Sequence, residues 1–177
     1  MIITYLTMIL ECYLLRNYIS GSIMRLYLVQ DGEAAPETID PNRPLTAKGK
    51  ADVLKIANFL KGKVNIEIIW HSTKIRARET AGIIAENISL KKGLFEKEGL
   101  APNDPIYNIK KDILSEKPED LMIVGHLPFL EKLASALLTD SKSYNLVGFH
   151  QAGMVCLEQT DKGNWTVAWI VIPDLIE

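Results

Sequence analysis

Three short apolar runs, each ending abruptly in polar residues, constrain the fold of this chain more than any other feature. Residues 25–29, 66–70 and 121–125 are rich in branched and aromatic side chains and have the length of buried strands. In an open α/β sheet, ligands bind in the crevice beyond the carboxyl ends of the strands. The polar residues after these runs are therefore candidates for a functional site, although polar turn residues end many strands for conformational reasons alone.

The candidate site takes residues from all three junctions. Gln30 and Asp31 follow the first run, and His126 follows the third. Arg76 lies in the first turn of a helix predicted over about residues 74–85. Because the helix dipole disfavours a cation there, Arg76 indicates an anionic partner, either a phosphate or a carboxylate. The alternatives are a solvated arginine and a structural, hydrogen-bonded histidine.

The other helices and strands follow from periodicity and capping signals. Helices are expected at about residues 46–60, 105–115 and 129–138. The predicted N-caps are Thr46, Asp104 and, for the helix over 74–85, Ser72 or Thr73. Residues 90–98 have the charged composition of a loop, with a solvated turn at Lys91 and Lys92. The tail predicts short strands at 146–149, 153–158 and 165–170, with Trp165 and Trp169 on one strand face.

Composition excludes several classes of protein. The 177 residues, 47% of them hydrophobic, suit one globular domain. A net charge of -2 gives no general attraction to nucleic acid. Cys12 and Cys156 lack metal-ligand or redox spacing, which favours buried apolar residues in a reduced, cytoplasmic protein. We find no Gly-rich phosphate loop, no zinc spacing and no Ser-centred elbow.

Residues 1–23 differ in character from the domain expected over 24–177. They are apolar, but Glu11 and Arg16 interrupt the run before it reaches the length of a membrane helix. A secretory signal is not indicated either, because a positive start and a small-residue cleavage site are lacking. Met24 stands directly before the first strand, so a misplaced translation start is the favoured interpretation. The alternative is an extra helix that packs on the domain or on a partner.

Five segments together resemble the histidine phosphatase superfamily, branch 1, and within it the short SixA-type phosphohistidine phosphatases. They are residues 28–34 (LVQDGEA), 43–49 (RPLTAKG), 71–81 (HSTKIRARETA), 100–102 (LAP) and 124–128 (VGHLP). The resemblance covers about residues 24–173, in the family's order. It implies a three-layer α/β/α sandwich with a mostly parallel central sheet, as in phosphoglycerate mutases. It implies no metal and no cofactor.

The resemblance also implies roles for individual residues. The family carries Arg-His-Gly after its first strand, and this histidine attacks phosphorus. At these three positions this chain has Gln30, Asp31 and Gly32. Arg76 matches the second phosphate-holding arginine, and His126 matches the second histidine of the pocket. Glu98 lies where many relatives carry a general acid, which short members often lack.

Asp31 is the main departure from the family pattern. Two like unit charges about 4 Å apart repel by about 4 kcal/mol at an effective dielectric of 20, which lowers phosphate affinity on the order of a thousandfold. Pairing of Asp31 with Arg76 and a protonated His126 would neutralise the empty pocket. We therefore predict little or no phosphatase activity. A natural pseudo-enzyme and a substitution introduced into an active parent both fit.

Three functional hypotheses follow. The first is a phosphatase, impaired by Asp31, that acts on phosphohistidine of a protein such as a histidine phosphotransfer domain, or on a small phosphoester, in cytoplasmic signal transduction. The second is a module that binds a phosphorylated partner without turnover. The third uses Asp31 as a nucleophile with magnesium, as haloacid-dehalogenase-like phosphatases do, but Asp31-Gly32-Glu33 is not their Asp-x-Asp motif. Neither nucleic acid nor a membrane is an expected partner.

Overall fold

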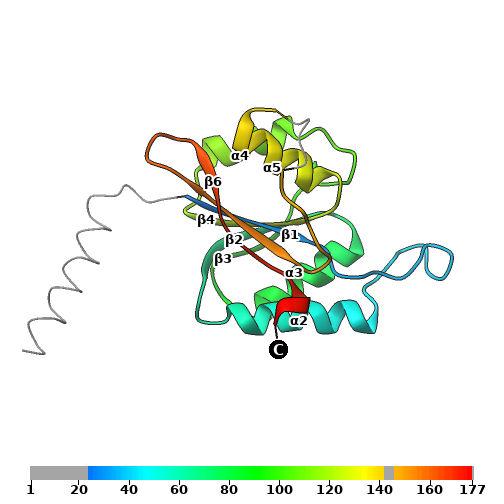
Figure 1. Ribbon diagram of the computed structural model, residues 1–177. Coiled ribbons are helices and arrows are strands. Elements are labelled where there is room, and N and C mark those ends of the chain that lie inside the picture. The colour runs from blue at the N-terminus through cyan, green and yellow to red at the C-terminus, as the bar shows by residue number, and fades with distance from the viewer. Residues whose placement is uncertain (1–23, 142–145, 177) are drawn as a thin grey trace, which may run out of the picture.

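The computed structural model describes residues 24–141 and 146–176 (Figure 1), and the predicted extension over 1–23 lies outside this part of the chain. A six-stranded sheet lies between two layers of helices. One face is covered by α2 (Ala47–Leu60) and α3 (Ile75–Asn87), and the other by α4 (Tyr107–Glu116) and α5 (Phe129–Thr139). This confirms the three-layer α/β/α sandwich. None of the helices described has the length and apolar character needed to cross a membrane.

The order of the strands brings the three predicted strand ends together. The strands are β1 (Arg25–Gln30), β2 (Asn65–His71), β3 (Ser89–Glu96), β4 (Asp120–Gly125), β5 (Met154–Gln159) and β6 (Trp165–Val171). They lie in the order β3-β2-β4-β1-β5-β6; the first four are parallel, and β5 is antiparallel to both of its neighbours. Because β2, β4 and β1 are adjacent and parallel, their carboxyl ends meet at one edge of the sheet.

Side-chain alternation along the central strands supplies both halves of the core. In β1, Leu26 and Leu28 are buried on the α4 and α5 side, whereas Tyr27 and Val29 are buried on the α2 and α3 side. The helices contribute apolar stripes, such as Val53, Ile56, Ala57 and Leu60 of α2. Burial on both faces explains why the central strands are continuous apolar runs in the sequence.

The start of α2 lies against the segment that leaves β1. Thr46 Oγ1 accepts a hydrogen bond from the N–H of Gly49 at 2.9 Å, which confirms Thr46 as the N-cap. A Cβ added at Gly49 would lie 2.1 Å from the carbonyl oxygen of Glu33, so only glycine permits this contact. The segment after β1 is thereby anchored on the N-terminus of α2.

Residues 90–98, predicted as a loop, instead lie mostly in β3, at the edge of the sheet. β3 pairs in parallel with β2, and Leu90 and Leu94 pack on the α2 and α3 side of the core. Lys92 forms an ion pair with Glu67 of β2 rather than lying in a solvated turn. The charged composition did not indicate this strand. An edge strand is stabilised by its backbone hydrogen bonds to the neighbouring strand and by one partly buried face, more than by the β propensity of its residues.

Two predicted helix caps are wrong. The helix α4 begins at Tyr107, and the carboxylate of Asp104 accepts a backbone N–H across a turn instead of capping the helix. The N-cap position of α3 is taken by Lys74, without a side-chain cap, so neither Ser72 nor Thr73 has that role. Short polar side chains near a helix start can satisfy several turn geometries, and composition does not select among them.

The two tryptophans of β6 lie on opposite faces of the sheet, contrary to the prediction. Trp165 is buried on the α4 and α5 side, whereas Trp169 packs on the other side against Tyr27, with ring centroids 5.9 Å apart. The pairing of β5 with β6 shifts by one residue after Cys156, and this bulge reverses the alternation. Residues 146–149, predicted as a further strand, lie outside the sheet.

Candidate active site

Asp31 lies directly beyond β1 and is held by the backbones of two neighbouring segments. Its N–H donates to the carbonyl oxygen of Gly125 at the end of β4 (3.0 Å), and its own carbonyl oxygen accepts from the N–H of Ala152, ahead of β5 (3.3 Å). Only 7% of its surface is exposed. A carboxylate buried to this extent requires charged or hydrogen-bonding partners.

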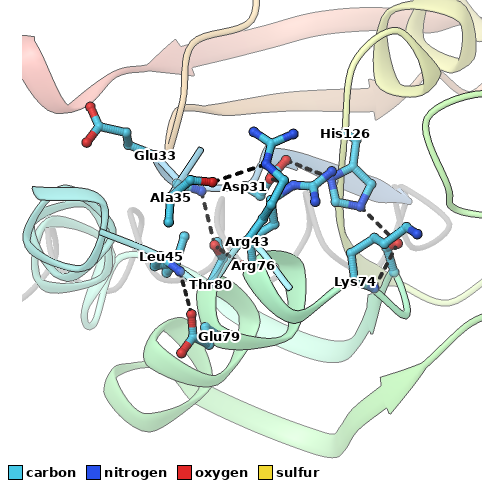
Figure 2. Close-up of polar contacts among 12 residues, drawn as sticks. Asp31, Glu33, Ala35, Arg43, Leu45, Lys74, Arg76, Glu79, Thr80 and His126 are labelled. Carbon is cyan, nitrogen blue, oxygen red and sulfur yellow. Dashed lines mark hydrogen bonds and ion pairs between the residues drawn. The ribbon is translucent and has the colours of Figure 1, made fainter. Parts of the chain in front are cut away.

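The partners of Asp31 come from the other two predicted strand ends (Figure 2). Arg76 Nε lies 2.6 Å from Asp31 Oδ2, and His126 Nδ1 lies 2.9 Å from Asp31 Oδ1. The side chains of Asp31, Arg76 and His126 are 10, 13 and 3% exposed. Because an ionised carboxylate only accepts hydrogen bonds, Nδ1 of His126 carries the hydrogen of this pair. The structure thus brings together three residues that are far apart in the sequence.

Ser72 joins the same cluster, although the sequence indicated only a capping role for it. Its N–H donates to the carbonyl oxygen of Val124 at 3.0 Å, which places it beside the end of β4. Its Oγ lies 2.9 Å from His126 Nε2, so the imidazole connects Ser72 on one side with Asp31 on the other. No sequence spacing signals this contact, because the three residues follow three different strands.

Thr80 ties the helix that carries Arg76 to the turn after β1. Its Oγ1 accepts from the N–H of Gly32 at 3.1 Å and donates to the carbonyl oxygen of Arg76 at 2.7 Å. Thr80 is fully buried. The relative positions of Asp31 and Arg76 are therefore set by hydrogen bonds as well as by their own ion pair.

Arg43 is a further residue that the sequence reasoning did not single out. Its side chain extends from the segment between β1 and α2 toward the Asp31 cluster (Figure 2), and its Nε donates to the carbonyl oxygen of Ala35 at 3.2 Å. Its φ of 51° is uncommon for a residue with a side chain. No described carboxylate forms an ion pair with it. Arg43 is thus a second cation on the side of Arg76.

Gln30 and Glu98, two further residues that the sequence proposed for the site, form no hydrogen bond or ion pair with Asp31, Arg76 or His126 in the described part of the chain. Gln30 ends β1, and its buried Oε1 has no hydrogen-bond partner among the residues described. Glu98 is exposed in the turn after the edge strand β3, and no hydrogen bond or ion pair within residues 24–141 and 146–176 joins it to Asp31, Arg76 or His126. The predicted acid is therefore not part of the cluster.

The buried titratable residues outside the Asp31 cluster have roles in packing and in hydrogen bonding to the backbone. Burial raises the pKa of the Cys156 thiol to about 12, which fits the predicted apolar role; Cys12 lies outside the described residues. His71 is buried at the end of β2, with Nδ1 2.9 Å from the carbonyl oxygen of Ser72. In the described part of the chain, no three His, Cys, Asp or Glu side chains are grouped so that they could hold a metal ion.

Sequence comparison relates part of the chain to a known superfamily. Residues 27–100 match the Histidine phosphatase superfamily (branch 1), a stretch that includes most of β1 as well as Asp31 and Arg76. This part of the chain is therefore similar to a superfamily of phosphatases. No curated protein sequence matches the chain significantly.

Solved structures resemble the fold over most of its length. The protein histidine phosphatase SixA complexed with tungstate is 24% identical with a TM-score of 0.76, over 85% of this chain and 98% of that one. A protein from Agrobacterium tumefaciens assigned as a SixA phosphohistidine phosphatase is 23% identical with a TM-score of 0.69, over 85% and 97%. A phosphoserine phosphatase variant from Entamoeba histolytica, with one histidine replaced by alanine and phosphoserine bound, is 15% identical with a TM-score of 0.63, over 83% and 96%. At these identities the likeness establishes the fold.

Proposed function

We propose that this chain is a SixA-type phosphohistidine phosphatase by descent whose phosphate pocket is neutralised by Asp31. The observation that supports the proposal is the position of the Asp31 carboxylate, 2.6 Å from Arg76 Nε and 2.9 Å from His126 Nδ1. By the family resemblance, this guanidinium and this imidazole would hold a phosphoryl group. Asp31 thus supplies the negative charge that a substrate would otherwise bring.

The chemistry of phosphoryl transfer explains why activity would be low. Catalysis of this transfer rests on positioning and on stabilisation of charge, and the family uses a neutral imidazole as the attacking group. A carboxylate at that position repels the incoming dianion by about 4 kcal/mol for unit charges about 4 Å apart at an effective dielectric of 20. Gln30 removes the positive charge that the family carries one residue earlier. We expect little or no turnover of phosphorylated substrates.

The proposed substrate class is phosphohistidine on a protein such as a histidine phosphotransfer domain. The similarity to the SixA structures supports this class. The absence of Glu98 from the described cluster fits it as well. An imidazole leaving group needs less protonation by a strong general acid than an alkoxide does.

Phosphate release from a phosphorylated histidine phosphotransfer domain tests this proposal. The present chain is compared with two variants. Asp31→His restores the family nucleophile, whereas Asp31→Asn removes the negative charge without supplying a nucleophile. We expect release only by Asp31→His. Family-like rates from the present chain would contradict the proposal.

A second candidate function is recognition of a phosphorylated protein without turnover. Arg43 supports it, because this guanidinium extends toward the cluster and has no described carboxylate partner. The Entamoeba histolytica variant, which lacks one histidine and is in complex with phosphoserine, is a precedent for a bound phosphoester on this fold. Isothermal titration with phosphorylated and unphosphorylated phosphotransfer domain decides the matter. Binding of the phosphorylated form alone, with no phosphate release by any variant, would make recognition the function.

A further inference from the structure

We propose that Ser72, His126 and Asp31 form a catalytic triad for acyl transfer, which hydrolyses small neutral carboxylic esters at Ser72. The inference goes beyond phosphatase chemistry, because the carboxylate at the family's nucleophile position becomes the group that orients the imidazole. It stands on the hydrogen-bonded chain from Ser72 Oγ through both nitrogens of His126 to Asp31 Oδ1.

The contacts have the order that an activated serine requires. Ser72 Oγ lies 2.9 Å from His126 Nε2, and His126 Nδ1 lies 2.9 Å from Asp31 Oδ1. Because Asp31 accepts the hydrogen on Nδ1, the neutral imidazole has its lone pair on Nε2 and can accept the hydroxyl hydrogen of Ser72. A nucleophile hydrogen-bonded to a base, which a third group orients, defines such a triad irrespective of sequence order.

Arg76 keeps Asp31 in this arrangement. It engages Asp31 through Oδ2, at 2.6 Å from Nε, which leaves Oδ1 directed at the imidazole. Asp31 is further held by two backbone hydrogen bonds, from its own N–H to Gly125 and from Ala152 to its carbonyl oxygen. The orienting carboxylate therefore cannot rotate freely, and the tautomer of His126 is set by a fixed partner.

Donors for a developing oxyanion lie next to Ser72. Ser72 stands between β2 and α3. In the first turn of α3 the N–H of Ala77 donates to the carbonyl oxygen of Lys74 at 3.0 Å, whereas the N–H groups of Ile75 and Arg76 have no acceptor within the described residues, and the helix dipole favours negative charge there. The guanidinium of Arg76 uses Nε on Asp31, and its other N–H groups have no acceptor within the described residues. Such donors are the usual means of stabilising a tetrahedral intermediate.

The charges of the cluster favour an ester over a phosphate. A phosphate dianion meets the Asp31 carboxylate, whereas the carbonyl group of an ester carries no charge to be repelled. The side chains of Asp31, Arg76 and His126 are at most 13% exposed, and Ser72 is 1% exposed. The acyl group must therefore be small, and an acetyl ester is the appropriate probe.

The reaction proceeds in two balanced stages. Ser72 Oγ attacks the carbonyl carbon while its proton passes to His126 Nε2; the ester C–O bond then breaks, and the alkoxide leaves as an alcohol with that proton. A water molecule next gives a proton to Nε2 and attacks the acyl-Ser72 carbon, and the carboxylic acid leaves as Oγ recovers the proton. Ester and water become acid and alcohol, and Asp31 remains ionised throughout.

Labelling of Ser72 is the first part of the test. The unmodified full-length chain is treated with a small dialkyl fluorophosphate, which forms an Oγ–P bond with loss of fluoride, and the modified peptide is identified by mass spectrometry. We expect stoichiometric modification of Ser72 and none of Ser115, an exposed serine of α4. This measurement needs no variant, so it does not depend on folding of a mutant. Failure to modify Ser72 would overturn the proposal.

Hydrolysis of 4-nitrophenyl acetate is the second part. We expect Ser72→Ala to lower the rate at least about a hundredfold, because it removes the nucleophile, and Ser115→Ala to leave it unchanged. Asp31→Asn should lower kcat with little change in KM, which a purely structural role would not produce. Full activity in folded Ser72→Ala, judged by circular dichroism, would refute the triad.

The substitution Asp31→His separates this inference from the proposed function. We expect it to abolish ester hydrolysis while phosphate release from the phosphorylated phosphotransfer domain appears. If the unmodified chain hydrolyses no ester but Asp31→His releases phosphate, the triad is refuted and the proposed phosphatase descent stands. If Asp31→His releases no phosphate, the labelling of Ser72 in the unmodified chain still tests the triad.

Discussion

Strands β1 and β4 carry a charged cluster at each end, and the two clusters differ in burial. At the carboxyl ends the cluster comprises Asp31, Arg76, His126 and Ser72, and its charged side chains are at most 13% exposed. At the amino ends, Arg25 pairs with Glu158 at 3.0 Å and with Asp120 at 3.7 Å, and its side chain is 46% exposed. Exposed pairs contribute about 0–1 kcal/mol, whereas removal of one partner from a buried pair costs about 3–5 kcal/mol.

A groove lies at the amino ends of β1 and β4, where the ion pairs of Arg25 are more exposed. The groove, of about 660 Å³, is lined by Arg25, Tyr27, Phe59, Asp120 and Trp169, among others. The hydroxyl of Tyr27 donates to Asp120 at 3.1 Å, and burial raises the pKa of both groups. The groove thus contains a tyrosine hydroxyl paired with a carboxylate, and its lining includes no imidazole. The comparison shows that a hollow by itself does not identify the candidate site in this fold, whereas the converging carboxyl ends of the strands bring an imidazole, a guanidinium and a serine together.

The largest expected effect is a gain in oxyanion binding by Asp31→Asn. Removal of the carboxylate frees Arg76 and abolishes a repulsion of about 4 kcal/mol, which corresponds to about a thousandfold in affinity. Isothermal titration with tungstate or phosphate measures it. The control is Asp161→Asn in the exposed turn between β5 and β6, which should not change affinity. Equal affinities of Asp31→Asn and the present chain would show that the carboxyl-end cluster is not an anion site.

The next effect is on stability. We expect Arg76→Met to lower the free energy of unfolding by about 3 kcal/mol, because it leaves the buried Asp31 with His126 alone. Arg78→Met, on the same helix but exposed, should change it by no more than about 0.5 kcal/mol. Urea denaturation followed by circular dichroism gives both values. Equal losses from the two variants would remove the distinction between the clusters.

A smaller effect is expected from Glu67→Gln, near the amino ends. A hydrogen bond from Lys92 lowers the pKa of Glu67, and the backbone N–H of Glu119, 2.6 Å from Glu67 Oε2, acts in the same direction. A lowered pKa in the folded state gives stability that is fully present above the unfolded value of 4.5 and is lost as pH falls through the folded value. We expect a loss of about 1 kcal/mol at pH 7, because Lys92 is largely exposed. Denaturation of both proteins from pH 7 to pH 3 should show the difference disappearing; a constant difference would argue against this linkage.

The smallest effect is expected from Arg25→Gln. Its own side chain is 46% exposed and Asp120 keeps the hydrogen bond from Tyr27, so the free energy of unfolding should fall by less than about 1 kcal/mol. In about 1 M salt, where the screening length is about 3 Å, the difference should vanish. Thermal unfolding at low and high salt tests this. If the free energy of unfolding falls as much as in Arg76→Met, the amino-end cluster contributes as much to stability as the carboxyl-end cluster.

Much of the architecture was predictable because local patterns specify it. Apolar runs of strand length, followed by polar residues and helical periodicity, located β1, β2 and β4 and the convergence of their ends. The features that were missed depend on distant partners. β3 required the ladder with β2, and the orientation of Trp169 required a bulge opposite Cys156. Neither leaves a periodic signal of its own.

The candidate site likewise contains residues that the sequence predicts and contacts that it does not. The residue types at the strand ends marked Asp31, Arg76 and His126 as candidates, and the expected pairing of the first two follows from their charges. The contact of Ser72 with His126 was not predictable, because a serine before a helix is equally suited to a capping role. Glu98 was a candidate by position in the sequence, yet it is exposed in the turn that follows the edge strand β3.

The sequence by itself determined which segments become buried strands and which polar side chains stand at their ends, because both properties depend on patterns within a few residues. Only the tertiary structure decided that the Asp31 carboxylate lies between a guanidinium and an imidazole, and that Ser72 reaches the far nitrogen of that imidazole. These contacts depend on the adjacency of β2, β4 and β1 in one parallel sheet. Adjacency in a sheet is set by packing and pairing between segments far apart in the chain, and no local pattern encodes it.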